Sequence, residues 1–233
     1  MKLSAMAWTV TKTALASGGG GVLAFIGLSW LLPLVTIDDL FGNNWAWTCG
    51  MLGAVTGVLI VATFVGNGYQ LSVPRWVMVW TYLVALAASA AAMGVLVIGY
   101  TQLSRVFGRE LLPQVHGFTG FLQAGNLLVS WVYLFALGFA FGIVGLFYGL
   151  AMAYIRTKTI LLLGFTVLPF MTFTAGFLIW ALVAWLLPGF KAMTDYVGGH
   201  PWAQIGVLGG LALVLALIFA QLYQRLDAPR QVR

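Results

Sequence analysis

The sequence predicts an all-α membrane protein with six transmembrane helices, preceded by an amino-terminal amphipathic segment in the membrane interface. Three observations predict this fold: 62% of the 233 residues are hydrophobic, 7% are charged, and the apolar residues form six long runs. Soluble domains are about 25% charged. Because backbone groups have no water to bond in hydrocarbon, each crossing is expected to be helical, within a single membrane domain at 1–233.

An interfacial segment and six spans are predicted in chain order, separated by short connections. Each span is an apolar run of about 20 residues or more, which is the length that a helical crossing needs. The interfacial segment is predicted at 1–17, and the spans lie near 20–37, 45–66, 76–100, 125–155, 159–187 and 202–223.

The first 17 residues mix apolar and basic side chains, which is typical of a helix that lies in the cytoplasmic interface. Met6 and Trp8 are apolar, with Trp8 suited to the aromatic belt, while Lys2 and Lys12 reach lipid head groups. The run SGGGG that follows, Ser17–Gly21, lacks the lysine of a phosphate-binding loop. We interpret it as a flexible hinge before the first span.

Small residues mark the helix faces that are expected to pack on other helices. Lipid gives no hydrophobic drive for helix association, so close approach through small side chains takes its place. The second span carries Gly50, Gly53 and Gly57. In the fourth span four glycines lie on one helix face: Gly138, Gly142, Gly145 and Gly149. This face predicts either packing within the chain or a seam between two subunits.

The boundaries and lengths of the other spans follow from similar signals. Asp38 and Asp39 mark the outer water boundary after the first span more simply than they make a cation site. The fourth span, at about 31 residues, is longer than a core of about 30 Å requires, so we expect it to tilt or protrude. In the fifth span, neighbouring threonines can bond the carbonyl that Pro169 frees.

The charges predict the orientation of the chain in the plasma membrane. With both termini in the cytoplasm, eight of the eleven basic residues lie on the inner side, as cytoplasmic loops of membrane proteins require. These eight are Lys2, Lys12, Arg75, Arg156, Lys158, Arg225, Arg230 and Arg233. The net charge of +6 thus reflects topology, and no cluster of basic and aromatic residues indicates a nucleic-acid partner.

The predicted spans lack the residues that intramembrane chemistry needs. No Asp, Glu, Lys, Arg or His occurs inside them, which disfavours a proton-coupled carrier. Ser89 and Ser130 have no histidine in a span to serve as base, so we predict no enzyme. His116, His200 and the single Cys49 lie far apart in the sequence, so we predict no metal site and no cofactor in this chain.

Two stretches of the sequence indicate a family. The first is FVGNGYQLSVPRWVMVW, residues 64–80, in which Asn67-Gly68 is expected to end the second span in a turn. The second is FALGFAFGIVGLFYGLAMAYIRTKTILLLGFTVLP, residues 135–169. They resemble the cytoplasmic turn into the third span, and the glycine-rich fourth span with its basic inner loop, of the permease subunits of type-two ATP-binding-cassette exporters, of the small bacterial kind with six spans. Such permeases often have consecutive basic residues after the serine, whereas here Val73 and Pro74 precede a single Arg75.

The resemblance implies that a separate cytoplasmic ATPase binds ATP and drives this chain together with a second permease copy or homologue. Arg156 and Lys158 would lie in the second cytoplasmic loop, and 1–17 would form an interfacial gate helix. The ATPase-coupling loop would consist of Asn67, Gly68, Tyr69, Gln70, Ser72, Arg75 and Trp76.

Two other functions remain open at this point. A substrate-capture subunit of a vitamin or metal importer would hold its solute in an outer pocket near Trp45, Trp47, Asn126 and 188–201. A non-transporting binding or immunity factor would act by contacting other membrane proteins, and the absence of any substrate motif favours it. The many aromatic residues are required by the interfacial belts and do not identify a cargo.

Overall fold

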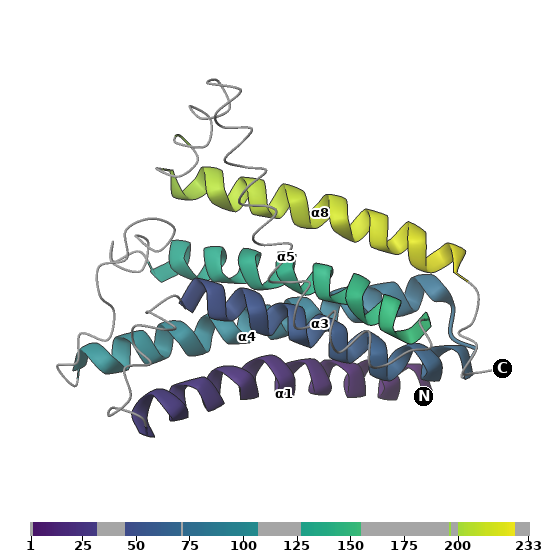
Figure 1. The fold of residues 1–233 in the computed structure, drawn as a ribbon, viewed down its shortest axis with the longest axis horizontal. Coiled ribbons are helices and arrows are strands. Elements are labelled where there is room, and N and C mark those ends of the chain that lie inside the picture. The colour runs from purple at the N-terminus through teal and green to yellow at the C-terminus, as the bar shows by residue number, and fades with distance from the viewer. Residues whose placement is uncertain are drawn as a thin grey trace.

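The chain folds into long α-helices that lie side by side (Figure 1). The computed structural model describes residues 2–31, 45–70, 72–106, 127–154, 196 and 200–226. Within these ranges there is no strand, and the long helices are α1 (Lys2–Leu31), α3 (Trp45–Gln70), α4 (Arg75–Val106), α5 (Leu127–Tyr154) and α8 (Pro201–Arg225).

Four of these helices are long and apolar enough to cross a membrane, as expected of a membrane protein. Their apolar stretches are Thr48–Gly66, Arg75–Tyr100, Leu127–Tyr154 and Trp202–Arg225. These agree closely with the second, third, fourth and sixth predicted spans, because an apolar run of sufficient length defines a crossing almost alone. The first predicted span, 20–37, lies partly outside the described residues, and the fifth, 159–187, lies wholly outside them.

The directions of the helices give the bundle two distinct ends. α1 and α4 begin at one end, and α3, α5 and α8 run toward it and finish there (Figure 1). Three of the residues that begin or finish helices at this end are basic, namely Lys2, Arg75 and Arg225, and we call it the basic end. α5 finishes at the basic end and α8 begins at the opposite end, which is the arrangement that a crossing at 159–187 requires.

The most extensive contact in the described bundle joins α3 to α5, and glycines make it possible. A Cβ atom at Gly53 would overlap the carbonyl oxygen of Gly138, and one at Gly57 would overlap that of Gly142. The residue numbers rise together along both helices, so the pair is parallel. Backbone packs directly on backbone here, as small residues allow in membrane helices.

The predicted glycine face of α5 is buried between helices of this chain. Gly138 lies between α3 and α4, and a side chain at Gly142 would meet Leu86 of α4. Cβ atoms at Gly145 and Gly149 would both meet backbone carbonyl oxygens of α3. Intramolecular packing therefore accounts for the spacing of these glycines, and their face is not available to a second subunit.

α1 is one uninterrupted helix, where the sequence predicted an interfacial segment at 1–17, a hinge and the start of a span. The prediction of a hinge is wrong, because Ser17–Gly21 is helical. Its glycines serve close packing: a Cβ atom at Gly18 would overlap the Oγ of Ser89 on α4. In a bundle of packed helices, a run of glycines lets a neighbouring helix approach closely. Such a run does not have to bend the helix that contains it.

Two polar contacts fix α1 against its neighbours. The Ser89 hydroxyl donates a hydrogen bond to the carbonyl oxygen of Ala14 at 2.9 Å. The hydroxyls of Ser17 and Thr56 lie 3.2 Å apart, which links α1 to α3. Hydroxyls that are bonded in this way hold helices in register, and the bond to Ala14 satisfies the buried Ser89 hydroxyl.

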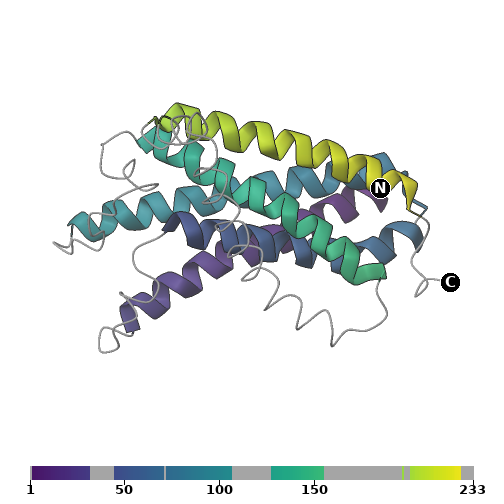
Figure 2. The ribbon, with the colours of Figure 1, turned by 45° about the horizontal axis from the view of Figure 1, so that its top comes forward.

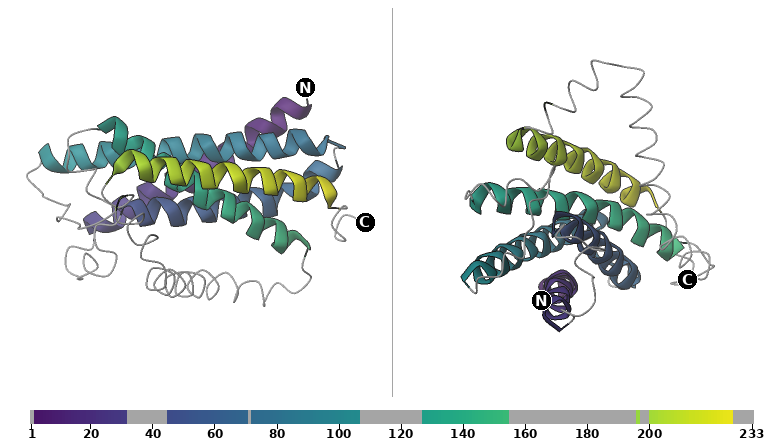
Figure 3. Two further views of the ribbon diagram at one scale, coloured as in Figure 1. Left: turned by 90° about the horizontal axis from the view of Figure 1, so that it is seen from above. Right: turned by 60° about the vertical axis from the view of Figure 1, so that its left-hand side comes forward.

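α8 packs on α5 and α4, on the side of the bundle opposite α1 (Figures 2 and 3). Its contact uses large aromatic side chains instead of glycines. The ring of Phe219 meets that of Phe147 with a centroid distance of 5.4 Å, and Tyr223 meets Tyr82 at 5.9 Å. The rings of Phe219, Tyr223 and Tyr82 are buried and that of Phe147 is partly buried. Only 11% of the apolar span of α8 is buried, so most of this helix faces outward.

Candidate functional site

The predicted coupling loop lies at the basic end, where α3 turns into α4. Asn67–Gln70 belong to the last turn of α3, so the prediction that Asn67-Gly68 breaks the helix is wrong. Pro74 disfavours helix at the residue before it, and the turn falls directly ahead of this proline. Ser72 is exposed with φ 52°, a left-handed conformation that few non-glycine residues adopt. The Pro74 carbonyl then accepts hydrogen bonds from the amides of Val77 and Met78.

Arg75 ties this turn to the far end of the chain. It is the first residue of α4, and its guanidinium donates a hydrogen bond to the backbone carbonyl of Gln224 in the last turn of α8. The last four carbonyls of a helix have no partner within the helix. A positive side chain also suits the negative end of the helix dipole. Arg75 thus caps α8 from a position 149 residues earlier in the sequence.

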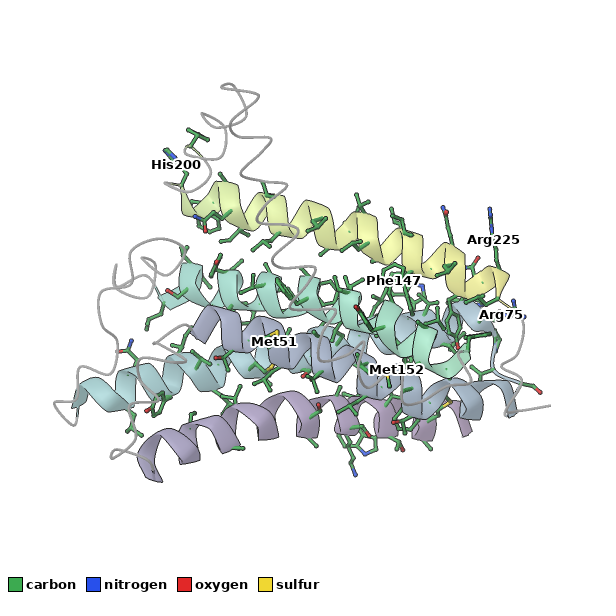
Figure 4. The ribbon with its side chains drawn as sticks, viewed as in Figure 1. Met51, Arg75, Phe147, Met152, His200 and Arg225 are labelled. Carbon is green, nitrogen blue, oxygen red and sulfur yellow. The ribbon has the colours of Figure 1, made fainter. Side chains whose placement is uncertain are left out.

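The basic end carries positive charge on adjacent helices. Arg75 and Arg225 lie at the same end of the bundle, on α4 and α8 (Figure 4). Trp76 follows Arg75 and is 59% exposed, as expected of an interfacial anchor. In the part of the chain that the structure describes there is no Asp or Glu at all. The described surface of this end is therefore suited to an anionic partner.

The amino-terminal site residues occupy opposite faces of α1. Met6 is buried in the bundle, whereas Trp8 is 58% exposed. The Lys12 ammonium lies over the Trp8 ring, 5.1 Å from its centroid, in a cation–π contact. Lys2 begins the helix. One face of this segment thus packs against protein and the other carries the Trp8 and Lys12 pair outward.

Other predicted site residues lie outside the described residues. They are Arg156 and Lys158 of the second cytoplasmic loop, together with Asn126 and most of 188–201 of the importer pocket. The backbone at Trp45 and Trp47 belongs to the start of α3. His200 lies at the end opposite Arg75 and Arg225 (Figure 4), stacked on Tyr196 at a ring-centroid distance of 4.1 Å.

A groove that the sequence analysis did not identify lies between α4, α5 and α8. It has a volume of about 460 Å³ and an apolar lining. One signal could have revealed it: Ala212, Ala216 and Ala220 recur every four residues on α8, and all three line the groove. Because alanine does not fill the space between helices, the stripe leaves a channel beside the larger side chains of α4 and α5.

Comparison of the chain with protein-family models, with curated proteins and with solved structures gives no match. The role of the chain is therefore inferred from two features of its geometry. One is the turn at the basic end, whose arginine is bonded to another helix, and the other is the apolar groove that opens beside that arginine.

Proposed function

We propose that the chain is the membrane-spanning permease subunit of an ATP-binding-cassette exporter in the bacterial plasma membrane. A separate cytoplasmic ATPase binds and hydrolyses ATP, and it contacts this chain at the basic end. The observation that carries the proposal is the bond from Arg75 to the Gln224 carbonyl. It joins the turn that resembles a coupling loop to a second membrane helix.

A bonded turn of this kind can pass a displacement into the membrane. α4 has 32 residues and is therefore about 48 Å long, enough to cross the whole bilayer as one rod. A push on Ser72–Arg75 moves the start of α4, and the Arg75 bond moves the end of α8 with it. The two helices form the groove together with α5, so moving both of them against α5 changes the width of the groove.

The charge distribution supports a cytoplasmic basic end with both termini inside the cell. Lys2, Arg75 and Arg225 all begin or finish helices there, and basic residues are retained on the cytoplasmic side of membrane proteins. An ATPase that docks at this end needs an acidic or polar surface to complement them. No Asp, Glu, Lys, Arg or His lies in the interior of the four apolar spans, which is consistent with an energy source on a partner.

The outward face of α8 supports a second permease copy or homologue as a further partner. Val207, Leu211 and Val214 are each more than half exposed along this helix. In the lipid bilayer such a face is stable without a protein partner, so apolar character alone does not demand one. A two-subunit permease would nevertheless use a face that the described helices leave uncovered, and among the four apolar spans the one with the smallest buried share is that of α8.

The proposal is tested by isolating the protein from its native membrane in mild detergent and identifying co-purifying proteins by mass spectrometry. We expect an ATP-binding-cassette ATPase with the wild type and its loss with Arg75→Glu. The matched control is Arg105→Glu, which makes the same charge change on the same helix near the opposite end. It should retain the ATPase, because the proposed contact lies at the other end.

Two outcomes would overturn the proposal. One is the absence of any ATPase under conditions that keep known permease complexes intact. The other is loss of the ATPase with both arginine variants, which would indicate a general effect of charge on folding. Recovery of a membrane protein without an ATPase would instead support the non-transporting binding factor, for which the uncovered apolar face of α8 is the specific observation in favour.

A further inference from the structure

The groove between α4, α5 and α8 runs in the direction of a lipid acyl chain and is long enough to span the hydrocarbon of one leaflet. On α8 it runs from Gly209 to Gln224, which is about 22 Å of helix. On α4 it begins at Trp76, directly after Arg75. It therefore starts at the basic end and extends to the middle of the bundle. One leaflet of a bilayer has a hydrocarbon depth of about 15 Å, half of a core of about 30 Å.

The size of the groove suits a flexible hydrocarbon chain. Its volume of about 460 Å³ falls in the range of small-molecule sites. The hydrocarbon core of the surrounding bilayer supplies such chains.

The lining agrees with this occupant. Phe135 and Phe139 of α5 stack with a centroid distance of 5.7 Å, and both line the groove. Trp80 of α4 and Leu217 of α8 also line it. Among the described residues of the lining, Gln224 is the one side chain with an amide or a charge, and it lies at the basic end. The site is thus apolar along its length and polar at one extremity, as an acyl chain with a head group is.

The charge at that extremity identifies the head group. Arg75 and Arg225 lie at the same end of α4 and α8 (Figure 4), and the Arg75 bond to Gln224 holds the first guanidinium beside the groove. Arginine binds phosphate oxygens through planar pairs of N–H donors. A lipid with a net negative head group is therefore favoured over a zwitterionic one, since basic residues near a membrane surface attract anionic lipids.

We propose that this groove is a binding site for an anionic phospholipid, with one acyl chain between α4 and α8 and the phosphate at Arg75 and Arg225. The site would hold the lipid specifically, unlike the annular lipid that covers every apolar face. The lipid site does not rest on the proposed function, because a lipid can occupy the groove in a protein that transports nothing. Arg75 takes part in both proposals, and the lipid titration below needs no ATPase.

The test is native mass spectrometry of the full chain in mild detergent, titrated with dioleoyl phosphatidylglycerol or dioleoyl phosphatidylcholine. The wild type should prefer phosphatidylglycerol. Removing both charges with R75Q/R225Q should weaken phosphatidylglycerol binding about 25-fold, at roughly fivefold for each basic residue. It should weaken the binding of phosphatidylcholine, whose head group has no net charge, by less. The matched control K12Q/R105Q also removes two positive charges, one from α1 on the other side of the bundle and one near the opposite end of α4. It should bind like the wild type.

A second variant tests the groove itself. Ala216→Phe places a ring in the channel, so it should abolish binding of both lipids. Dibrominated acyl chains give a readout that does not depend on this variant folding: they should quench the fluorescence of Trp76 and Trp80, and the quenching should fall in W76F/W80F.

Three results would overturn the site. They are a phosphatidylglycerol preference that survives R75Q/R225Q, quenching that is the same in wild type and W76F/W80F, and a lipid-free wild type whose groove is occupied by another part of the chain or by a second copy. Cross-linking from a cysteine at position 216 would detect the last of these.

Discussion

α5 and α8 are similar in length and apolar character but are held in the bundle by different means. Their mean hydropathies are 2.2 and 2.4, yet 50% of the span of α5 is buried against 11% of that of α8. α5 has glycines that bring its backbone against α3, whereas α8 is attached by Phe219 and Tyr223. In this bundle the spacing of small residues, and not hydrophobicity, determines which helix is central.

Glycine content alone does not explain the difference either. α8 contains Gly206, Gly209 and Gly210, and no atom outside the local helix lies within 4 Å of a Cβ built at any of them. A glycine contributes to packing only where a second helix presents a matching small face, as Gly53 and Gly57 of α3 do for α5.

The largest expected effect comes from a side chain in the seam between α3 and α5. Gly57→Leu would place its Cβ against the carbonyl oxygen of Gly142, a backbone atom that cannot turn aside. Overpacking typically costs 1–3 kcal/mol even where neighbours adjust, so we expect the helix pair to separate and the folded protein to be lost on size-exclusion chromatography. Gly210→Leu is the matched control and should fold, because its site is open. Equal yields of the two variants would refute the seam.

The attachment of α8 should be the next most sensitive feature. Phe219→Ala removes a fully buried ring that contacts Phe147, and such truncations cost about 3–5 kcal/mol in protein cores. Thermal unfolding in detergent measures the change. The neighbouring Ile218 is 50% exposed, so Ile218→Ala should alter stability by less than about 0.5 kcal/mol. If both substitutions have the same effect, α8 is not held by its aromatic residues.

A smaller effect is expected at the link between the start of α4 and the end of α8. Arg75→Gln removes the bond to the Gln224 carbonyl and should lower the free energy of unfolding by about 1 kcal/mol, since the site is partly exposed. Gln224→Ala keeps the backbone acceptor and should be neutral. A loss of stability in Gln224→Ala equal to that in Arg75→Gln would place the important contact on the glutamine side chain.

The smallest expected effect on stability is that of replacing glycine by alanine, which can be compared at two positions. Gly210→Ala should raise stability by up to about 1 kcal/mol, because alanine is the better helix former and nothing lies near its Cβ. Gly145→Ala should lower it, because its Cβ would meet the Ala54 carbonyl oxygen. Chemical unfolding of both variants measures the two signs. Changes of the same sign would show that local helix preference outweighs the contact.

The sequence predicts the helices that depend on local composition. The apolar runs that become α3, α4, α5 and α8 are long enough to define crossings, and their ends agree closely with prediction. The errors fall where glycine was interpreted as a break: Ser17–Gly21 and Asn67-Gly68 are both helical. In a membrane the backbone must satisfy its own hydrogen bonds, so the turn preferences known from soluble proteins are weaker. They are also weaker where a glycine gives a neighbouring helix the space to approach.

The candidate site was predicted only in part, since its decisive contacts are distant in the sequence. The position of Arg75 at the start of α4 follows from Pro74 and the apolar run after it. Its partner, the Gln224 carbonyl, is a backbone group without any side-chain signature. The groove depends on the relative placement of three helices, and the alanine stripe on α8 is its single local sign.

The parallel arrangement of α3 and α5 imposes an order on synthesis. The glycine face of α3 is complete once Gly57 has been made, but the residue that caps the opposing face, Gly149, follows about 90 residues later. At 5–20 residues per second, the ribosome takes roughly 5 to 20 seconds to produce it. During that time α4 is synthesised, and the glycine face of α3 has no α5 to pack against. A nascent chain that stops before α5 therefore leaves the glycine face of α3 unpaired in the membrane, where quality-control proteins can recognise it.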